Sequence, residues 1–296
     1  LDGRKLVTHQ IPTGIVHPGV KCWIAAGCVV DIGKLNDEIC VLESAGVSNI
    51  AERLFISPAC HVITDEMIIY DKSNNSVGTT GSGIGPTYAA KAYRTGKRVS
   101  DIIKTGGFTG RLSAVNILER IPHHEVASSE ILLEGAQGFH LDIDWGQYPF
   151  VTACNCIAPY AMVSTGLPMK FVRNIIGIAK IYETYVGSNT FQGSDPELAT
   201  LQQLGQEFGA TTGRKRQTNW LNLRELAKAI AVNNTNKVII NKCDIMKECG
   251  AFKLIDREGM LKVFPAMLVM KRFIVEQLTN QFPDIEIEFS GVKNGL

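Results

Sequence analysis

The stretch KVIINKCD, residues 237–244, is the strongest indicator of architecture in this chain. Its first half is a short, β-branched apolar run without polar alternation, which is typical of a strand buried on both faces of a parallel sheet. Three more runs have this character: residues 23–30 (WIAAGCVV), 130–138 (EILLEGAQG) and 174–182 (NIIGIAKIY). We predict that all four are strands of one large, mostly parallel central sheet.

Segments with helical periodicity alternate with these runs. They cover residues 35–46, 87–94, 112–120, 222–233 and 260–280. Alternation of strands and helices predicts an α/β fold in which helices flank the sheet. The sequence shows no internal repeat and no convincing linker, so we expect residues 1–296 to form a single domain.

The bulk composition is that of an ordinary globular protein. Of the 296 residues 45% are hydrophobic and 20% are charged, and the formal net charge is +1. Such a charge predicts neither a nucleic-acid-binding nor a membrane-binding surface. The eight cysteines include no C-x-x-C pair, so we expect reduced thiols in a cytoplasmic protein and no zinc site.

The second half of the opening stretch, NKCD, matches an Asn-Lys-x-Asp guanine-reading turn. In such a turn Asp244 would accept two hydrogen bonds from the guanine N1–H and exocyclic amine, while the stem of Lys242 packs over the ring. Adenine lacks this donor pair. Yet the sequence contains no G-x-x-x-x-G-K-[ST] phosphate loop, so the motif alone leaves the phosphates without a binding element.

Three loops rich in glycine and polar residues interrupt the strand and helix pattern, at residues 77–88, 134–155 and 208–220. In the first, GTTGSGIGP, closely spaced glycines and hydroxyls precede a helix expected from Pro86, a combination that favours phosphate binding. Arg94 would lie two turns into that helix.

In the second loop, Gln137 follows a predicted strand, the usual location of ligands in open α/β sheets, and Thr152 lies in a further polar turn. His140, Asp142 and Asp144 suggest a metal site, but one histidine at this spacing favours alternating sides of a strand instead.

The third loop, FGATTGRKR, predicts an anion site because Arg214 and Arg216 can each bind a carboxylate or phosphate through two hydrogen bonds. Read as a solvated basic loop, the same segment would have no ligand.

Four motifs in this order resemble the adenylosuccinate synthetase family: GTTGSGIGPTY, EGAQG with YPFVTACN, FGATTGRKR and NKCD. The resemblance runs from about Gly3 to the end of the chain and implies a fold related to P-loop NTPases. It also implies that the family's own phosphate loop, its catalytic aspartate base and its histidine acid lie upstream of Leu1. No catalytic residue or metal ligand is therefore assigned within the chain.

The activity implied by the resemblance is a GTP-dependent ligation of L-aspartate to inosine monophosphate (IMP). GTP phosphorylates the 6-oxygen of IMP, and the aspartate amine then displaces phosphate to give adenylosuccinate. Mg²⁺ would be the metal cofactor, and GTP a co-substrate. The enzyme would be a homodimer in which Arg94 reaches the neighbouring active site.

The resemblance also assigns binding residues, position by position. Those for IMP are Thr80, Arg94, Gln137, Thr152 and Arg214. Those for aspartate are Ala210, Thr211, Thr212, Gly213, Arg214 and Arg216. Those for GTP are Arg216, Lys242, Cys243, Asp244, Ser290 and Gly291.

Two other readings stay open at this point. A phage-type relative would join aspartate to dGMP, although the intact NKCD motif argues against it. A GTP-binding regulatory or non-catalytic protein would explain NKCD but would leave FGATTGRKR without a role. One departure from the family pattern, Tyr185 in place of an arginine, concerns the region expected near the sugar.

Overall fold

The computed structural model describes residues 6–74, 77–105, 112–121, 123–209 and 213–291. The chain divides into two compact units, Leu1–Phe171 and Val172–Leu296, here called the amino-terminal and carboxy-terminal units. Each unit is described by itself, and the expected single domain stays a prediction.

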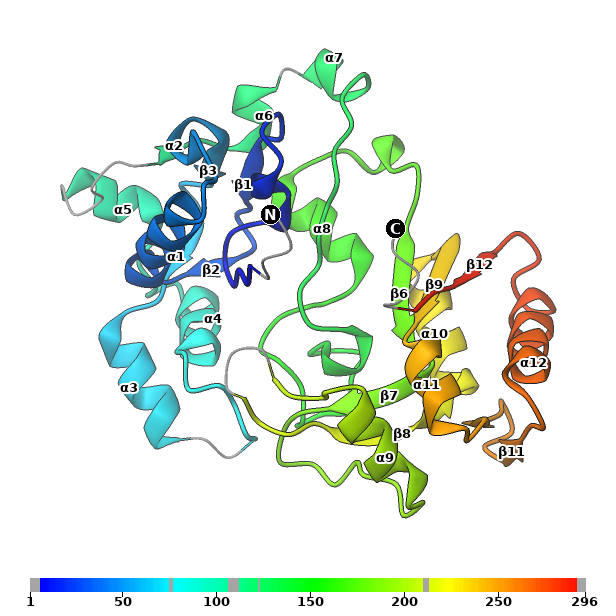
Figure 1. Ribbon diagram of the computed structural model, residues 1–296. Coiled ribbons are helices and arrows are strands. Elements are labelled where there is room, and N and C mark those ends of the chain that lie inside the picture. Colours follow the sequence, from blue (N-terminus) through cyan, green and yellow to red (C-terminus); the bar gives the residue numbers. More distant parts are fainter. Residues whose placement is uncertain (1–5, 75–76, 106–111, 122, 210–212, 292–296) are drawn as a thin grey trace. The chain divides into compact units, whose positions relative to one another are not determined.

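The amino-terminal unit contains two small parallel sheets (Figure 1). In the first, β3 (Leu54–Ile56) pairs with β1 (Cys22–Ile24) on one side and β5 (Ser113–Ala114) on the other. In the second, β2 (Val29–Val30) pairs with β4 (His61–Val62).

Helix α1 (Ile32–Ser44) covers these strands with one apolar face. Its buried residues Leu35, Ile39 and Leu42 are spaced by four and three positions, so they lie on one side of the helix. The Asp31 side chain caps its start by accepting a hydrogen bond from the backbone N–H of Lys34.

The other helices of this unit are α2 (Ile50–Arg53), α3 (Asp65–Ser73), α4 (Ile84–Tyr93), α5 (Val99–Lys104), α6 (Ile117–Arg120), α7 (His123–Val126) and α8 (Ala158–Thr165). Three 3₁₀ turns complete it: η1 (Thr13–Val16), η2 (Phe139–Leu141) and η3 (Met169–Phe171).

The carboxy-terminal unit also contains two sheets. The parallel one has the order β12 (Glu286–Phe289), β9 (Lys237–Asn241), β6 (Ile176–Lys180), and Figure 1 shows these strands side by side. The mixed one has the order β11 (Leu261–Val263), β10 (Lys253–Ile255), β8 (Gln217–Asn222), β7 (Tyr182–Tyr185).

The helices of this unit are α9 (Glu197–Leu204), α10 (Leu223–Asn233), α11 (Cys243–Cys249) and α12 (Met267–Thr279). Helix α10 buries Leu223, Ala227 and Ile230 on one face, and the side chain of Asn222 caps its first turn. One hydrophobic core cluster contains residues of α9, α10, α11 and α12 and of both sheets. Strands β9 and β12, which end at the predicted site, therefore pack against the same core.

The α/β class with mostly parallel sheets is confirmed, although the described strands belong to four sheets instead of one. Among the described strands, only the β7–β8 and β10–β11 pairs are antiparallel. The helices predicted at 35–46, 87–94 and 222–233 are α1, α4 and α10.

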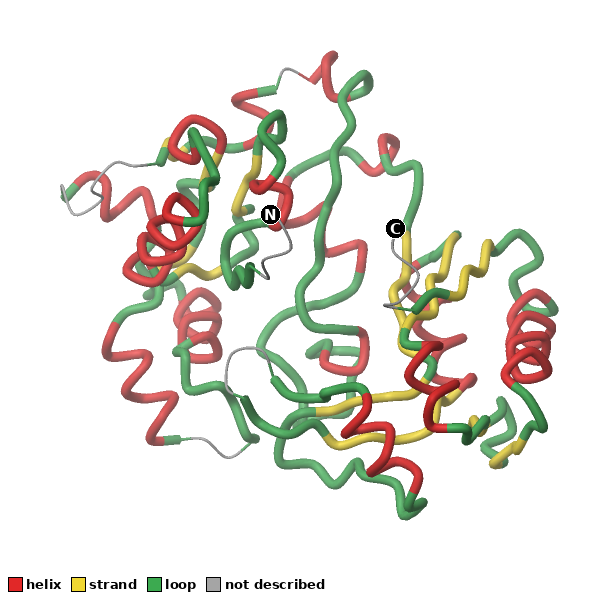
Figure 2. The backbone as a smooth tube through the Cα atoms, in the orientation of Figure 1, coloured by secondary structure: helices red, strands yellow, loops and turns green. Residues whose placement is uncertain are grey.

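The strand predicted at residues 130–138 is wrong, because this segment is a loop between α7 and η2 (Figure 2). Ile131 and Leu133 pack against a small apolar cluster, while Leu132 between them is 87% exposed. Burial thus alternates along residues 131–133, but no described strand pairs with this segment.

Other boundaries also differ from the prediction. Residues 23–30 form parts of two strands, β1 and β2, separated by a turn. Residues 112–120 are the short strand β5 followed by α6, not one helix, and 260–280 begins with strand β11 before α12. No described helix is both long and apolar enough to cross a bilayer.

Candidate nucleotide and aspartate site

The NKCD motif follows β9 in the parallel sheet of the carboxy-terminal unit. Lys242 adopts the left-handed conformation (φ 63°) and turns the chain from β9 into α11. The backbone N–H of Cys243 then donates a hydrogen bond to the Ser290 carbonyl, at 3.1 Å. The predicted guanine-reading residues on β9 and β12 therefore come together where these two strands end.

The carboxylate of Asp244 lies against Gly291, two residues after the end of β12. Its Oδ1 is buried and has no hydrogen-bond partner among the described residues. A Cβ on Gly291 would stand 2.9 Å from this oxygen, so only glycine allows the approach. A buried acceptor without a donor is costly, and a bound molecule with N–H groups would satisfy it.

The described residues on the two sides of FGATTGRKR, 208–209 and 213–216, are paired with each other within the same unit. Phe208 and Lys215 form an isolated antiparallel bridge, and the N–H of Gly209 donates to the Arg214 carbonyl at 2.8 Å. Gly213 has φ +64°, which favours glycine at this turn. The predicted aspartate ligands Ala210, Thr211 and Thr212 lie outside the described residues.

Glu207, which directly precedes these paired residues, binds three side chains from different elements. Its carboxylate accepts hydrogen bonds from Lys180 Nζ at 2.8 Å, Arg216 NH1 at 3.0 Å and Tyr182 Oη at 2.7 Å. The Glu207 side chain is only 2% exposed, whereas those of Lys180 and Arg216 are 23% and 30% exposed. The network holds the Arg216 side chain in one place.

The electrostatics of Glu207 follow from these partners. Burial alone would raise its pKa, but hydrogen bonds from Lys180 and Tyr182 outweigh burial, and the pKa is lowered. The positive charge of Lys242 acts in the same direction. Lys242 Nζ in turn donates to the Gly205 carbonyl at 3.1 Å. Two predicted GTP-binding residues, Arg216 and Lys242, are thus linked through the segment 205–207.

The sequence analysis missed Glu207. The available signal was a lone carboxylate just before a loop that carries two arginines and a lysine. A cluster of like charges in a folded protein requires a counter-ion, and Glu207 is the acidic residue nearest to the cluster in sequence.

In the amino-terminal unit, Asp71 of α3 fixes the glycine-rich loop that precedes α4. Its two carboxylate oxygens accept hydrogen bonds from Thr79 Oγ1 at 2.9 Å and from the Gly83 N–H at 2.8 Å. Thr80 is left exposed, with its hydroxyl 3.0 Å from that of Ser82. No sequence motif predicts this role of Asp71, because it resembles any polar residue of a surface helix.

Helix α4 begins at Ile84, two residues before the Pro86 start that we predicted, and ends at Tyr93. Arg94 is the exposed residue that follows it, in the left-handed conformation (φ 64°). Ten helical residues separate Thr80 from Arg94, or about 15 Å of helix. The two residues therefore lie at opposite ends of the helix.

Asp142 organises the loop that carries Gln137 and Thr152. Its carboxylate is fully buried and accepts hydrogen bonds from the backbone N–H groups of Asp144, Trp145 and Cys156. Burial opposes ionisation, but these N–H groups outweigh it and lower the Asp142 pKa. Asp142 therefore stabilises the loop. The prediction that residues 140–144 form a strand with alternating sides is wrong, because η2 and a loop occupy these positions.

Gln137 and Thr152 lie on either side of η2 in the same loop. Gln137 is exposed and has φ 60°, and its Oε1 lies 3.9 Å from Cys156 Sγ. The backbone N–H of Thr152 donates to the carbonyl of Leu141, the last residue of η2, at 2.7 Å. Two of the predicted IMP-binding residues are thus brought to one loop cluster.

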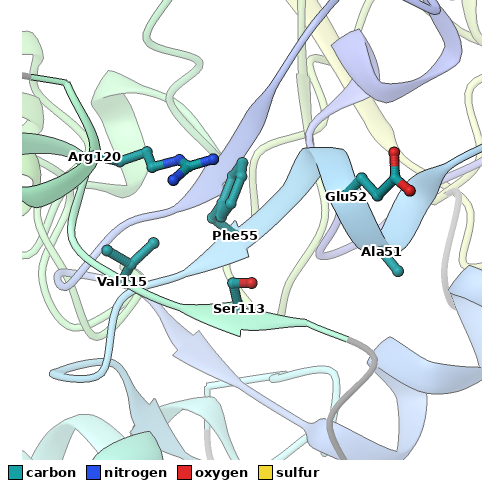
Figure 3. Close-up of a pocket in the computed structure, with 6 residues that line it drawn as sticks. All are labelled: Ala51, Glu52, Phe55, Ser113, Val115 and Arg120. Carbon is teal, nitrogen blue, oxygen red and sulfur yellow. The ribbon is translucent and has the colours of Figure 1, made fainter.

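A hollow of about 420 Å³ lies elsewhere on the amino-terminal unit, and none of the predicted site residues lines it (Figure 3). Its wall includes Phe55, whose ring stacks on Trp23 and lies 5.7 Å from the Arg120 guanidinium. Its other lining residues are Ala51, Glu52, Ser113 and Val115.

Within the described part of the chain, no group of three or more His, Cys, Asp or Glu side chains could hold a metal ion.

The described residues place a buried carboxylate oxygen of Asp244 just after a strand of a parallel sheet, where open α/β proteins bind their ligands. The profile of the adenylosuccinate synthetase family matches residues 1–121 and 113–268. The chain belongs to the adenylosuccinate synthetase family, whose members are ligases that form a C–N bond.

Individual relatives agree with the profile. The adenylosuccinate synthetase of Vesicomyosocius okutanii is 32% identical over 97% of this chain and 82% of its own length. That of Paraburkholderia phymatum is 34% identical over 86% of this chain and 68% of its own length.

Two solved structures share the fold. A fully ligated adenylosuccinate synthetase from Plasmodium falciparum has a TM-score of 0.77 at 24% identity and covers 94% of this chain and 76% of its own. A succinoaminodeoxyadenylate synthetase of cyanophage S-2L, bound to dGMP and dATP, has a TM-score of 0.70 at 19% identity and covers 98% of this chain and 79% of its own.

Proposed function

We propose that this protein joins L-aspartate to IMP at the expense of GTP, through a 6-phosphoryl-IMP intermediate, and releases adenylosuccinate, GDP and phosphate. The observation that carries the proposal is the buried Oδ1 of Asp244, which has no hydrogen-bond partner among the described residues, in a chain of this family. Guanine offers two adjacent N–H donors for such an acceptor, whereas adenine does not.

In two steps, the reaction replaces the C6–O bond of IMP by a C6–N bond to aspartate. The 6-oxygen of IMP first attacks the γ-phosphorus of GTP, and GDP leaves. The amine of aspartate then attacks C6, and the C–O bond breaks so that the oxygen departs as part of phosphate. Phosphorylation thereby converts a poor leaving group into a good one.

In this proposal, the carboxy-terminal unit binds GTP and aspartate. Asp244 and Lys242 recognise guanine, with Cys243, Ser290 and Gly291 shaping the turn around them. Arg214 and Arg216 bind carboxylates of aspartate, because a guanidinium donates two parallel hydrogen bonds to such a group. Glu207 supports this role by holding Arg216 through a 3.0 Å hydrogen bond.

The amino-terminal unit would bind the IMP phosphate and ribose through Thr80, Gln137 and Thr152. Arg94 is exposed and lies at the far end of α4 from Thr80. This separation supports a role for Arg94 at the phosphate of a neighbouring subunit's IMP, and hence a homodimer. The cytoplasm is part of the proposal as what the family resemblance implies. Mg²⁺ would bind to the phosphates of GTP.

The test is a turnover assay of the full chain with Mg²⁺, aspartate and each pair of nucleotides. We expect the ultraviolet change of adenylosuccinate formation with IMP and GTP. We expect at least a tenfold lower kcat/KM when ATP replaces GTP, and no ligation when dGMP replaces IMP. Ligation of dGMP but not of IMP, or equal use of ATP and GTP, would contradict the proposal.

A further inference from the structure

A second hollow of the amino-terminal unit, of about 210 Å³, contains basic side chains that the proposed function does not use. It is lined by His61 of β4, Lys91 of α4 and Arg98, which directly precedes α5. Tyr160 and Ser164 of α8 belong to the same wall. Side chains from four separate elements therefore meet at one small cavity.

The backbone places the side chains of His61 and Arg98 next to each other. These two residues form an isolated antiparallel bridge. The residues on either side of the pair are joined by backbone hydrogen bonds of 2.9 Å, so the bridge is of the non-hydrogen-bonded kind. In such a pair the two side chains lie on the same face and close together.

The imidazole of His61 is buried and has an unused nitrogen. The residue is 4% exposed, and its Nδ1 has no hydrogen-bond partner among the described residues. The opposite edge of the ring packs on Gly96, where an added Cβ would stand 2.8 Å from Cδ2. Gly96 does not line the cavity, so the edge that carries Nδ1 is the one left to face it. A buried polar atom of this kind requires a partner.

The charges of Lys91 and Arg98 are not neutralised by an ion pair among the described residues. Burial and these two positive charges lower the pKa of His61, so its imidazole is neutral at pH 7. Asp101 is the acidic group whose charge acts on His61 in the opposite direction. One oxygen of Asp101 accepts a hydrogen bond from the backbone N–H of Arg98 at 3.0 Å.

Ser164 adds a hydroxyl to this wall. Its Oγ accepts a hydrogen bond from the Gly27 N–H at 3.0 Å, and its O–H proton has no acceptor among the described residues. The Tyr160 hydroxyl, in contrast, points to the Gly27 carbonyl at 3.4 Å. The cavity thus combines an ammonium, a guanidinium, an imidazole and a hydroxyl, all of which can donate hydrogen bonds.

We propose that this cavity binds inorganic phosphate at a site separate from those for IMP, aspartate and GTP. The Arg98 guanidinium can donate two parallel hydrogen bonds to phosphate, and Lys91 supplies a point charge. Sites for larger ligands measure about 300–1,000 Å³, so a cavity of about 210 Å³ suits a small ion and is too small for a nucleotide. Lys91 also lies seven residues after Ile84, or about 10 Å along α4 from the end next to Thr80.

The experiment titrates the full chain, labelled with ¹⁵N-histidine, with inorganic phosphate in the absence of substrates. We expect the Nδ1 signal of His61, identified by sequential assignment, to shift and to saturate. Lys91→Met and Arg98→Met should each weaken the apparent affinity about tenfold, because each removes a charge-assisted hydrogen bond.

Lys97→Met is the matched control. Lys97 is exposed and adjacent to Arg98, but successive side chains of an extended strand point to opposite faces, so this change should leave the titration curve unchanged. Thr80→Ala, at the proposed IMP site, should also leave it unchanged.

A His61 signal that does not respond to phosphate would overturn the proposal. Equal weakening by Lys97→Met and Arg98→Met would overturn it as well, since it would indicate unspecific attraction to a basic surface. Weakening by Thr80→Ala but not by Arg98→Met would place the ion at the proposed IMP site instead. The titration needs neither substrate nor turnover, so its failure is distinguishable from failure of the proposed ligase activity.

Discussion

Replacing Asp244 by asparagine is expected to weaken GTP binding about 100-fold and to leave IMP binding unchanged. A charged acceptor contributes about 1.5–3 kcal/mol per hydrogen bond, and about 1.4 kcal/mol corresponds to a tenfold change in affinity. Asp244 Oδ1 is buried without a partner among the described residues, so a guanine ring would supply its donors. The asparagine amide would meet those donors with its own N–H groups.

Asp244→Asn should also change the preferred base from guanine to xanthine. Xanthine has a carbonyl where guanine has its exocyclic amine, and an asparagine N–H can donate to this carbonyl. Asp244→Asn should therefore bind XTP more tightly than GTP, whereas the wild type prefers GTP. Equilibrium titration with GTP and XTP measures the ratio of the two dissociation constants, once for the wild type and once for Asp244→Asn.

Asp284→Asn is the matched control, because Asp284 is an exposed carboxylate in the same unit. It should leave both affinities unchanged. Gly291→Ala provides a second approach, since its Cβ would stand 2.9 Å from Asp244 Oδ1 and displace the carboxylate. Unchanged GTP affinity in both Asp244→Asn and Gly291→Ala would show that guanine is recognised elsewhere.

The second large effect is expected from Glu207→Gln. This change leaves Lys180 and Arg216 without their buried counter-ion and places an amide N–H group among three donors. Loss of one partner from a buried ion pair costs about 3–5 kcal/mol, and the partial exposure of the two cations places the expected loss near the lower value. Chemical denaturation of the full chain measures this difference in the free energy of unfolding.

Function should change as well, because Arg216 loses its anchor. We expect the KM for aspartate to rise about tenfold, while the KM for IMP changes less than twofold. Tyr182→Phe removes one hydrogen bond of the network but no charge, so it should cost only about 1 kcal/mol and leave the KM for aspartate unchanged. Glu258→Gln, at an exposed position of the same unit, is the control for the charge change.

The pH dependence gives an independent readout. The pKa of Glu207 is lowered in the folded protein, so its stabilising contribution is present above the pKa of an unfolded glutamate, about 4.3. It is lost as the pH falls through the folded pKa. The stability difference between wild type and Glu207→Gln should therefore shrink below about pH 4, and a difference that stays constant would contradict this account.

Local sequence patterns predicted helices α1 and α10 because burial repeats along one face of each. Leu35, Ile39 and Leu42 mark α1, and Leu223, Ala227 and Ile230 mark α10. The NKCD turn was also located correctly, since the end of a buried strand is visible in the sequence. These features depend on neighbours within a few positions along the chain.

Features that depend on distant partners were not predicted. The run ILL at 131–133 has apolar character, but its strand assignment required hydrogen-bonding neighbours that periodicity does not reveal. Asp71 and Glu207 bind residues 8 to 27 positions away. Their roles depend on the fold that brings those residues to them. For Glu207 the sequence offered one signal, its position just before a basic loop, and for Asp71 it offered none.

The most direct test of the central claim follows the 6-oxygen of IMP. The full chain is supplied with IMP labelled with ¹⁸O at this position, together with GTP, aspartate and Mg²⁺, and the released phosphate is analysed by mass spectrometry. Transfer of the phosphoryl group to this oxygen predicts one ¹⁸O atom in each phosphate and none in adenylosuccinate. Adenylosuccinate formed together with unlabelled phosphate, with the label released as water, would contradict the proposed two-step ligation.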